Sequence, residues 1–274
     1  MSKPVLFLSL LTLSSFVYAA PAKSRREQTK RGLAFDYWEG AYTYAFSGVQ
    51  NHFSWMYNWG SSYEDAISLP FVPMLHDNMG KSTEVWNENV EKAYQAGARE
   101  VFSVNEPDQC GGGGACIQDV QGMVDFHKTW MQPLADKYDD LRISTPPITD
   151  GVPWPNGTKM GVEYLKEFVQ KCDDCQLDFV VAHWYNDASN VVYFKNHLQD
   201  VYSAGGKRPV WLTEFGTTGG DTGAFMKEVL PWLDQQDWIE RYAYHYAHPG
   251  ILLTPSSTPN SPGLSELGRM YATT

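Results

Sequence analysis

The fold is decided where an apolar run ends in a carboxylate, in the stretch Val101-Phe102-Ser103-Val104-Asn105-Glu106-Pro107-Asp108. The β-branched and aromatic residues at its start predict a buried strand. Pro107 has no N–H to give to a strand ladder and restricts the residue before it, so the strand must end here. Glu106 is therefore expected at the carboxyl end of a strand.

A second stretch repeats this design, Pro209-Val210-Trp211-Leu212-Thr213-Glu214-Phe215-Gly216. An isolated glutamate at the end of a strand is usually only solvated, and two of them are weak evidence by themselves. The context strengthens the argument, because each glutamate ends an apolar strand and the two strands are different ones. Two such carboxylates are what a glycosidase needs, one as acid and base and the other as nucleophile.

The rest of the chain alternates predicted strands and helices. Strands are predicted at residues 32–37, 53–57, 69–75, 100–104, 141–144, 178–182, 210–213 and 239–244. Helices are predicted at 82–96, 117–138, 160–169, 188–202, 222–233 and 264–271. Eight apolar strands with no dividing linker predict a single-domain α/β fold, a closed (β/α)8 TIM barrel. A doubly wound open sheet is the alternative with the same pattern.

In a (β/α)8 barrel the catalytic groups lie at the carboxyl ends of the strands. The predicted strand ends carry acids, amides, imidazoles and aromatic rings: Asp36, Tyr37, Trp55, Asn58, Trp59, His76, Asn105, Glu106, His183, Tyr185, Glu214, Tyr244 and His245. This set is too polar and too aromatic for a purely structural rim. Glu106 on the fourth strand and Glu214 on the seventh are expected to face each other across the mouth.

Charge and composition narrow the class of partner. The net charge of −11 argues against a nucleic acid, because phosphate binding depends on Lys and Arg. A neutral polymer is a better match than a polyanion for a chain with this negative charge. The 14% aromatic content, with 10 Trp and 16 Tyr, suits either a surface that stacks against sugar rings or an aromatic core.

The N-terminal residues have the pattern of a secretory signal peptide. Lys3, an apolar run and small residues near Ala19 and Ala22 predict a signal peptide over residues 1–19, with cleavage as late as 22, and a membrane anchor is the alternative. Residues 20–31 end in a dibasic pair and are a possible pro-segment, which leaves 32–274 as the catalytic domain. We expect a secreted protein, extracellular or in the cell wall, with no membrane contact after signal cleavage.

In a secreted protein the four cysteines are expected to form disulfides. Three connectivities are possible, and the local pairs Cys110–Cys116 and Cys172–Cys175 are favoured because each lies in one predicted loop. A zinc site would need similar pairs, and the first spacing is poor for it. Two further motifs are the sequon at Asn156, a plausible glycan site, and a run of glycines at 111–114. That run lacks the Lys-Ser/Thr of a phosphate loop.

Three motifs in strand order resemble glycoside hydrolase family 128, the fungal-type endo-β-1,3-glucanases of the large (β/α)8 clan, clan A. They are Asn105-Glu106-Pro107-Asp108, Ala182-His183-Trp184-Tyr185 and Trp211-Leu212-Thr213-Glu214-Phe215-Gly216. The opening Arg31-Gly32-Leu33-Ala34-Phe35-Asp36-Tyr37 is also similar to the family's first strand. The resemblance runs from Gly32 to the C-terminus.

The resemblance implies a retaining hydrolase of β-1,3-glucan that cuts within the chain, with Glu106 as acid/base and Glu214 as nucleophile. Asn105 would bond the sugar 2-hydroxyl, or else cap the strand end. His183 and Tyr185 would orient Glu214 or line the cleft. The remaining residues expected to bind substrate are Trp55, Trp59, Trp184, Asn58, Tyr37, His76 and Tyr244, although each tryptophan could equally be core. A monomer without cofactor or metal is expected.

Two rival interpretations remain. A metal could be held by His76, Asp77, His183 and His245, although no paired histidine spacing supports this. The chain could instead be a non-catalytic protein that binds wall glucan on the same fold, against which the presence of both glutamates argues.

Overall fold

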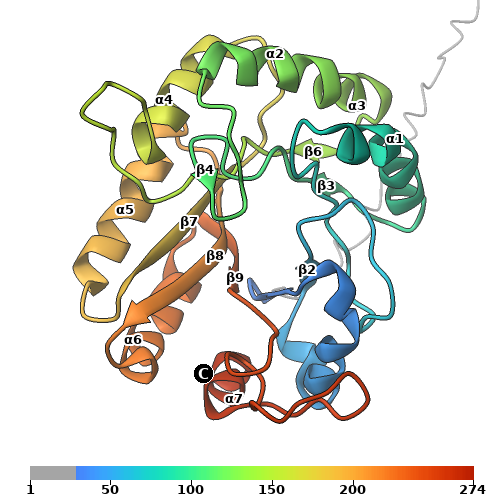
Figure 1. Cartoon of the computed structure of the whole chain (residues 1–274), viewed down its shortest axis with the longest axis vertical. Helices are drawn as coiled ribbons and strands as arrows, with labels where there is room; N and C mark the ends of the chain where they lie inside the picture. The colour runs from blue at the N-terminus through green and yellow to red at the C-terminus, as the bar shows by residue number, and fades with distance from the viewer. Residues whose placement is uncertain (1–28) are drawn as a thin grey trace, which may run out of the picture.

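The structure is a computed structural model that describes residues 29–274 (Figure 1). The predicted signal peptide and the first part of the predicted pro-segment lie outside these residues. The strands are β1 (Gly32–Ala34), β2 (Trp55–Tyr57), β3 (Glu100–Val101), β4 (Cys110–Gly111), β5 (Gly114–Ala115), β6 (Arg142–Ile143), β7 (Val180–Asp187), β8 (Val210–Gly219) and β9 (Ile239–Tyr244). The helices are η1 (Tyr37–His52), α1 (Gly80–Gln95), α2 (Val120–Trp130), α3 (Gln132–Lys137), α4 (Gly161–Lys171), α5 (Val191–Ala204), α6 (Thr222–Gln235) and α7 (Glu266–Thr273).

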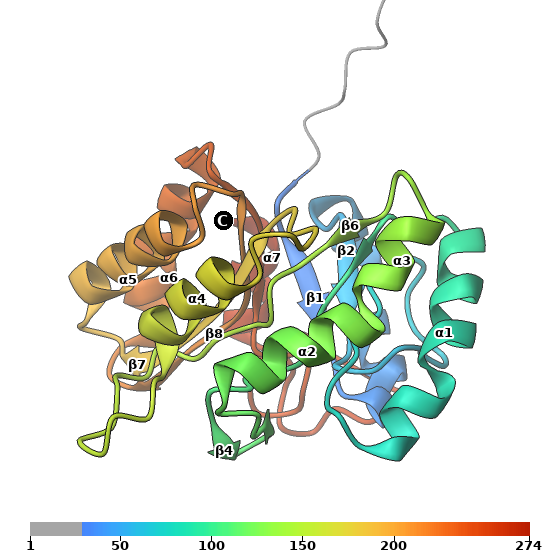
Figure 2. The same ribbon diagram turned by 90° about the horizontal axis from the view of Figure 1, so that it is seen from above.

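The barrel strands pair in parallel and in the order of a barrel, whereas β4 and β5 form a separate antiparallel hairpin. β1 pairs with β2, β3 with β6, and β7, β8 and β9 form one sheet. Single parallel bridges join these sheets at Met56–Phe71, Met74–Phe102, Ser144–Phe179 and Arg31–Tyr242. The regular strands form separate short sheets and no continuous closed barrel, so the predicted architecture is confirmed as a TIM-barrel-like α/β fold. Figure 2 shows the helices packed on the outside of the strands.

The predicted third strand, residues 69–75, is not regular. Only Phe71 and Met74 form bridges within it. Pro70 and Pro73 interrupt the segment, and because proline has no N–H, a continuous ladder cannot form there.

The helices differ from the prediction in two places. The helix expected over 117–138 divides into α2 and α3, because Pro133 in the first turn of α3 cannot donate to the preceding turn. Helix η1, a 3-10 helix from Tyr37 to His52, had not been predicted. Its apolar spacing is weak, and Glu39 and Val49 depart from helical geometry.

The barrel interior is aromatic. Trp55, Phe102, Phe179 and Trp211 are fully buried, and the ring centroids of Trp55 and Trp211 lie 5.1 Å apart. Much of the aromatic content therefore fills the core. Both predicted disulfides, Cys110–Cys116 and Cys172–Cys175, are present. No helix within residues 29–274 is long and apolar enough to cross a membrane.

Arg31 fastens the first strand to the C-terminal part of the chain. Its guanidinium donates to the Tyr242 hydroxyl at 2.7 Å, to the Tyr271 carbonyl at 2.8 Å and to Asp234 at 3.1 Å. Its side chain also donates to the backbone oxygen of Thr274, and the residue is 4% exposed. Arg31 is therefore part of the fold, and cleavage after it, at the predicted end of the pro-segment, would remove these contacts.

We expect Arg31→Ala to lower the free energy of unfolding by about 2–4 kcal/mol, because it leaves several buried acceptors without a donor. For a chain of this length the melting temperature should fall by about 5–12 °C, as measured by thermal denaturation. Arg99→Ala is the matched control, since the exposed Arg99–Asp140 pair contributes at most about 1 kcal/mol. Equal melting temperatures for the two variants would contradict this role for Arg31.

Candidate active site

Glu106 lies five residues after the end of β3, because this strand stops at Val101 and is shorter than the predicted 100–104. Its N–H donates to the Pro147 carbonyl at 3.0 Å, which ties it to the segment after β6. Its backbone has a φ of +39°, a region that non-glycine residues rarely adopt. Such strain is typical of functional sites. The residue is 5% exposed, so the carboxyl group is held in a largely desolvated position.

Glu214 lies within β8, which continues to Gly219 and so extends beyond the predicted strand end. Its Oε1 accepts from Trp59 Nε1 at 2.6 Å, and its Oε2 accepts from the Tyr185 hydroxyl at 2.6 Å. Both carboxylate oxygens are therefore held by donors from elsewhere in the barrel, Trp59 from the loop after β2 and Tyr185 from β7. Glu214 is 6% exposed.

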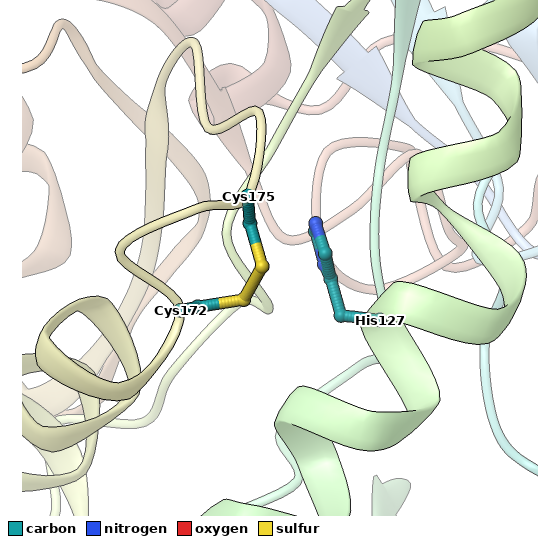
Figure 3. Close-up of side chains that lie close together, drawn as sticks. All are labelled: His127, Cys172 and Cys175. Atoms are coloured by element: carbon teal, nitrogen blue, oxygen red, sulfur yellow. A yellow bond between two sulfur atoms is a disulfide. The ribbon is translucent and has the colours of Figure 1, made fainter.

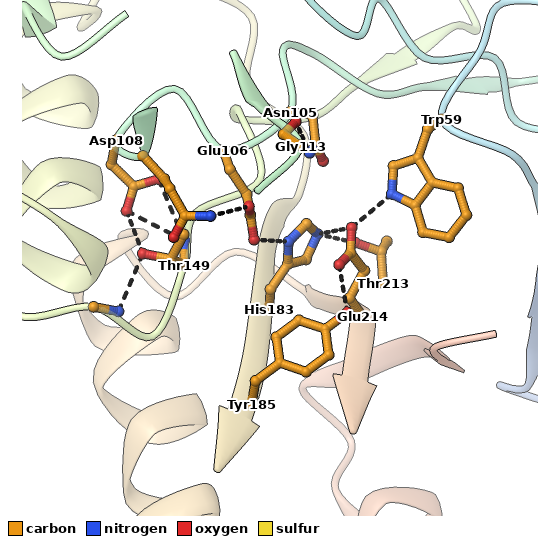
Figure 4. Close-up of polar contacts among 12 residues, drawn as sticks. Trp59, Asn105, Glu106, Asp108, Gly113, Thr149, His183, Tyr185, Thr213 and Glu214 are labelled. Carbon is orange, nitrogen blue, oxygen red and sulfur yellow. Dashed lines mark hydrogen bonds and ion pairs between the residues drawn. The ribbon is translucent and has the colours of Figure 1, made fainter. Parts of the chain in front are cut away.

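His183 on β7 lies between the two glutamates (Figure 4). Its Nδ1 is 2.7 Å from Glu106 Oε1, and its Nε2 is 2.9 Å from Thr213 Oγ1 and 3.3 Å from Glu214 Oε1. One side-chain atom from each of His183, Glu106 and Glu214 lies within 4.8 Å of the others. The structure therefore brings together the two predicted glutamates, as expected from strands that meet at one end of a barrel.

The electrostatics keep Glu214 ionised. Burial by itself would raise the pKa of Glu214, but His183, His245 and the hydrogen bonds from Tyr185 and Trp59 outweigh it, and the pKa is lowered. Burial likewise would lower the pKa of His183, whereas Glu214 and the bond to Glu106 raise it above its ordinary value. The pKa of Tyr185 is raised by burial and by Glu214, so its hydroxyl stays a donor.

A cleft of about 440 Å³ opens over the two glutamates, a size typical of ligand sites. Seven residues predicted from the sequence line it: Tyr37, Asn58, Trp59, His76, Asn105, Glu106 and Glu214. The other lining residues are Asp36, Gly60, Gly112, Gly113, His245 and Tyr246. Asp36 and His245 were among the predicted strand ends, whereas Tyr246 and the three glycines had not been proposed for the site.

Three predicted substrate-binding residues lie elsewhere. Trp55 and Trp184 have no exposed surface, and the Trp184 ring stacks on Phe225, so the prediction of sugar platforms at these two positions is wrong. Trp184 lies on the opposite face of β7 from His183 and Tyr185 and packs against the helices, whereas Trp55, at the start of β2, lies deep in the barrel interior. Tyr244 is 4% exposed and lines a separate small hollow beside Tyr185.

The glycine run forms one wall of the cleft, which the sequence did not reveal. It turns the β4–β5 hairpin, closed by the Cys110–Cys116 disulfide, and Asn105 Nδ2 donates to the Gly113 carbonyl at 3.1 Å. Asn105 Oδ1 is buried and has no partner among the described residues, which leaves an acceptor for a ligand hydroxyl. Gln109, also unpredicted, places its Nε2 3.3 Å from Glu106 Oε2.

The cluster of Glu106, His183 and Glu214 places three ligand atoms close enough together to hold a metal ion. Both ring nitrogens of His183 already have partners, however, so the imidazole has no unshared ligand atom in this arrangement. The other proposed metal set, which added His76, Asp77 and His245 to His183, is not brought together within 29–274.

A second group joins His127 on α2 to the Cys172–Cys175 bridge, toward which its ring points (Figure 3). The sulfur atoms of Cys172 and Cys175 are bonded to each other, whereas a cysteine that binds a metal does so as a thiolate. His127 has no exposed surface, and burial lowers its pKa to about 4. The His127 imidazole is therefore neutral and packs beside the disulfide.

Most of the chain matches a known protein family. Residues 32–271 match the family described as "Glycosyl hydrolase catalytic core". Alkali-sensitive linkage protein 1 of Schizosaccharomyces pombe is 28% identical over 258 residues. That match covers 88% of this chain and 44% of the relative, so the chain spans less than half the length of that protein.

Among solved structures, a family 128, subgroup III, curdlan-specific exo-β-1,3-glucanase from Blastomyces gilchristii is 29% identical with a TM-score of 0.75. It covers 89% of this chain and 98% of its own. A subgroup II endo-β-1,3-glucanase from Sorangium cellulosum is 22% identical with a TM-score of 0.72, over 89% and 98%. A subgroup VII oligosaccharide-binding protein from Cryptococcus neoformans shares the fold at 19% identity and a TM-score of 0.63, over 90% and 93%.

Proposed function

Because this chain belongs to the glycosyl hydrolase catalytic core family, and its resemblance to glycoside hydrolase family 128 is confirmed, we propose that it hydrolyses β-1,3-glucan with retention of anomeric configuration. The observation that carries the proposal is the pair of buried carboxylates on the floor of one cleft, Glu106 and Glu214. Their oxygens approach within 4.8 Å, close to the separation of about 5–5.5 Å that retaining enzymes use.

In the first step Glu214 attacks the anomeric carbon, and the bond from that carbon to the glycosidic oxygen breaks. Glu106 gives its proton to the departing oxygen. The donors Trp59 and Tyr185 hold the Glu214 carboxylate in place before the attack. Its charge is then consumed in the ester bond to the sugar.

In the second step water attacks the anomeric carbon and Glu106 takes a proton from that water. The ester bond breaks and Glu214 leaves as a carboxylate. His183 contacts both carboxyl groups, so its imidazole can stabilise the negative charge on Glu214 before the first step and on Glu106 after it. The Asn105 amide oxygen, without a partner, fits the role of an acceptor for a sugar hydroxyl.

We extend the proposal to the whole catalytic unit. Residues 32–274 form one (β/α)8 catalytic domain that is secreted, acts as a monomer outside the cell or in the cell wall, and cuts within the glucan chain. Asn58, Tyr37 and His76 bind substrate from the walls of the cleft, together with Trp59.

The test is product analysis on linear β-1,3-glucan, with β-1,4-glucan as the control. We expect a series of oligosaccharides from the first only, and proton NMR of the earliest product should show the β-anomer. One short product from the start of the reaction would replace endo with exo action, the action described for the similar Blastomyces enzyme.

A second candidate function is binding without hydrolysis, which the Cryptococcus oligosaccharide-binding protein of the same fold favours. That function does not require an ionised Glu214 held by two donors beside a second carboxyl group. Binding of β-1,3-glucan with no release of sugar would support it over catalysis.

Tyr185→Phe tests the charge on Glu214. The substitution removes one hydrogen bond that keeps the Glu214 pKa low, so the pKa rises. Since Glu214 must be ionised to attack, the acidic limb of the kcat/KM profile should move to higher pH, with a loss of about ten-fold on that limb. Tyr193→Phe is the control, because its hydroxyl contacts the Asp150 carbonyl outside the cleft. An unmoved acidic limb would contradict the proposed coupling.

A further inference from the structure

A second groove opens beside the active site where the fold lacks a helix. Within 29–274, the connection from β2 to the bridge residue Phe71 is the only link between successive barrel strands without a helix. In a barrel of this kind a helix normally covers each such link. Here a loop, residues 58–70, takes its place between η1 and α1.

The loop is held to η1 by several contacts, whereas one hydrogen bond, between Asn89 and Ser61, joins it to α1. The Ile67 N–H donates to Thr43 Oγ1 at 2.8 Å, and the Tyr44 hydroxyl donates to Asp65 at 3.2 Å. Gly40 of η1 lies so close to the loop that an added Cβ would meet the Glu64 carbonyl at 2.3 Å. These contacts hold the loop against η1, so a space remains along α1.

This space, which we call the α1 groove, has a volume of about 460 Å³. Its walls come from the loop and from α1, including Ser61, Ser62, Tyr63, Phe71, Asn89 and Ala93. One hydrogen bond crosses it, from Asn89 Nδ2 to Ser61 Oγ at 2.9 Å. The groove is as large as the catalytic cleft, and none of the residues that line it takes part in the mechanism above.

The lining of the α1 groove matches the two kinds of surface on a pyranose sugar. Tyr63 is 40% exposed, and its ring rests on Phe71 with centroids 4.7 Å apart, which gives a supported aromatic face. Such a face stacks on the C–H side of a sugar ring. No hydrogen bond among residues 29–274 uses the Tyr63 hydroxyl or the Asn89 amide oxygen, so both can meet sugar hydroxyls.

Charge points to a neutral ligand. Among residues 29–274, Lys92 is the only charged residue that lines the α1 groove, and its ammonium lies 2.5 Å from Glu88 on the same helix. The groove therefore presents hydroxyl, amide and aromatic groups without an unpaired charge, which suits a neutral glucan better than an anionic ligand.

The α1 groove also adjoins the active site through the chain itself. Asn58, Trp59 and Gly60 line the catalytic cleft, and the next three residues, Ser61, Ser62 and Tyr63, line the groove. We propose that the α1 groove is a second, non-catalytic binding site for β-glucan, which keeps the enzyme on its polymer. This inference rests on the proposed function, because the ligand is the substrate of the neighbouring cleft.

The test is titration of the Glu214→Gln variant of residues 32–274, preceded by their native Thr29-Lys30-Arg31, with a β-1,3-linked trisaccharide, followed by amide NMR shifts. We expect two independent sets of shifts, one at Gly112 and Gly113 in the cleft and one at residues 89–98 in the groove. Tyr63→Ala in the same background should weaken binding at the groove set by about ten-fold and leave the cleft set unchanged. Tyr193→Ala, which removes a tyrosine of similar exposure, should change neither set.

Activity gives a second readout with the catalytic residues intact. Tyr63→Ala should keep kcat/KM on soluble oligosaccharides within about two-fold and lower the rate on insoluble β-1,3-glucan several-fold. Shifts at the cleft without shifts at the groove would overturn this inference and leave the proposed function standing. Binding at neither site, together with no hydrolysis by the unmutated enzyme, would overturn both.

Discussion

Glu214→Gln is expected to lower kcat on β-1,3-glucan by about 10⁴-fold or more. An amide cannot form the glycosyl ester, so the double displacement loses its first bond-forming step. A loss of this size corresponds to about 5.5 kcal/mol of transition-state stabilisation. Substrate binding should persist, because Gln keeps the shape of the side chain and the cleft walls are unchanged.

The measurement is kcat from reducing-sugar release, with binding of a trisaccharide followed in parallel. Glu228→Gln on α6 is the matched control, since Glu228 is exposed and pairs only with Lys195. The control should retain the activity of the unmutated enzyme. Unchanged turnover in Glu214→Gln would overturn the assignment of the nucleophile, whereas loss of binding as well would indicate damage to the cleft.

Glu106→Gln should lower kcat on β-1,3-glucan by about 10²–10⁴-fold, because the departing sugar oxygen no longer receives a proton. An aryl glycoside with an acidic phenol as leaving group needs no such proton in the first step. On that substrate the variant should release a rapid burst of phenol, followed by slow turnover as the second step waits for a base.

Glu106→Ala separates this role from a structural one. The shortened side chain leaves space for azide, which needs no base to attack the glycosyl ester, so added azide should restore turnover of the aryl glycoside and yield a β-glycosyl azide. Azide should have no effect on Glu214→Gln. Equal losses of Glu106→Gln on the polymer and on the aryl glycoside would argue against an acid/base at this position.

Local patterns in the sequence predicted which residues matter most. Pro107 cannot continue a strand, so the position of Glu106 beyond the end of an apolar strand follows from one covalent feature, although β3 already ends at Val101. The apolar strands around Trp211 and Val180 follow from their runs of β-branched and aromatic residues. The local disulfides follow from short spacing, which brings cysteines together whatever the rest of the fold does.

The prediction failed where the depth of a side chain along the barrel had to be decided. Trp59 lies in the cleft and donates to Glu214, whereas Trp55, four residues earlier, packs in the barrel. Both were equally apolar and equally near a strand end. Which of them meets a ligand depends on strand tilt and on the neighbours across the barrel, and neither is written in a stretch of a few residues.

The sequence by itself therefore determined the two glutamates that follow apolar strand segments, the alternation of strands and helices and the local disulfides, because each depends on neighbours in the chain. Only the tertiary structure decided that His183 lies between Glu106 and Glu214, that Gln109 reaches Glu106 and that the glycine hairpin walls the cleft. It also decided that the loop after β2 leaves the α1 groove open. These arrangements depend on contacts between residues far apart in the chain or on opposite sides of a turn, and such contacts are set by how the elements pack.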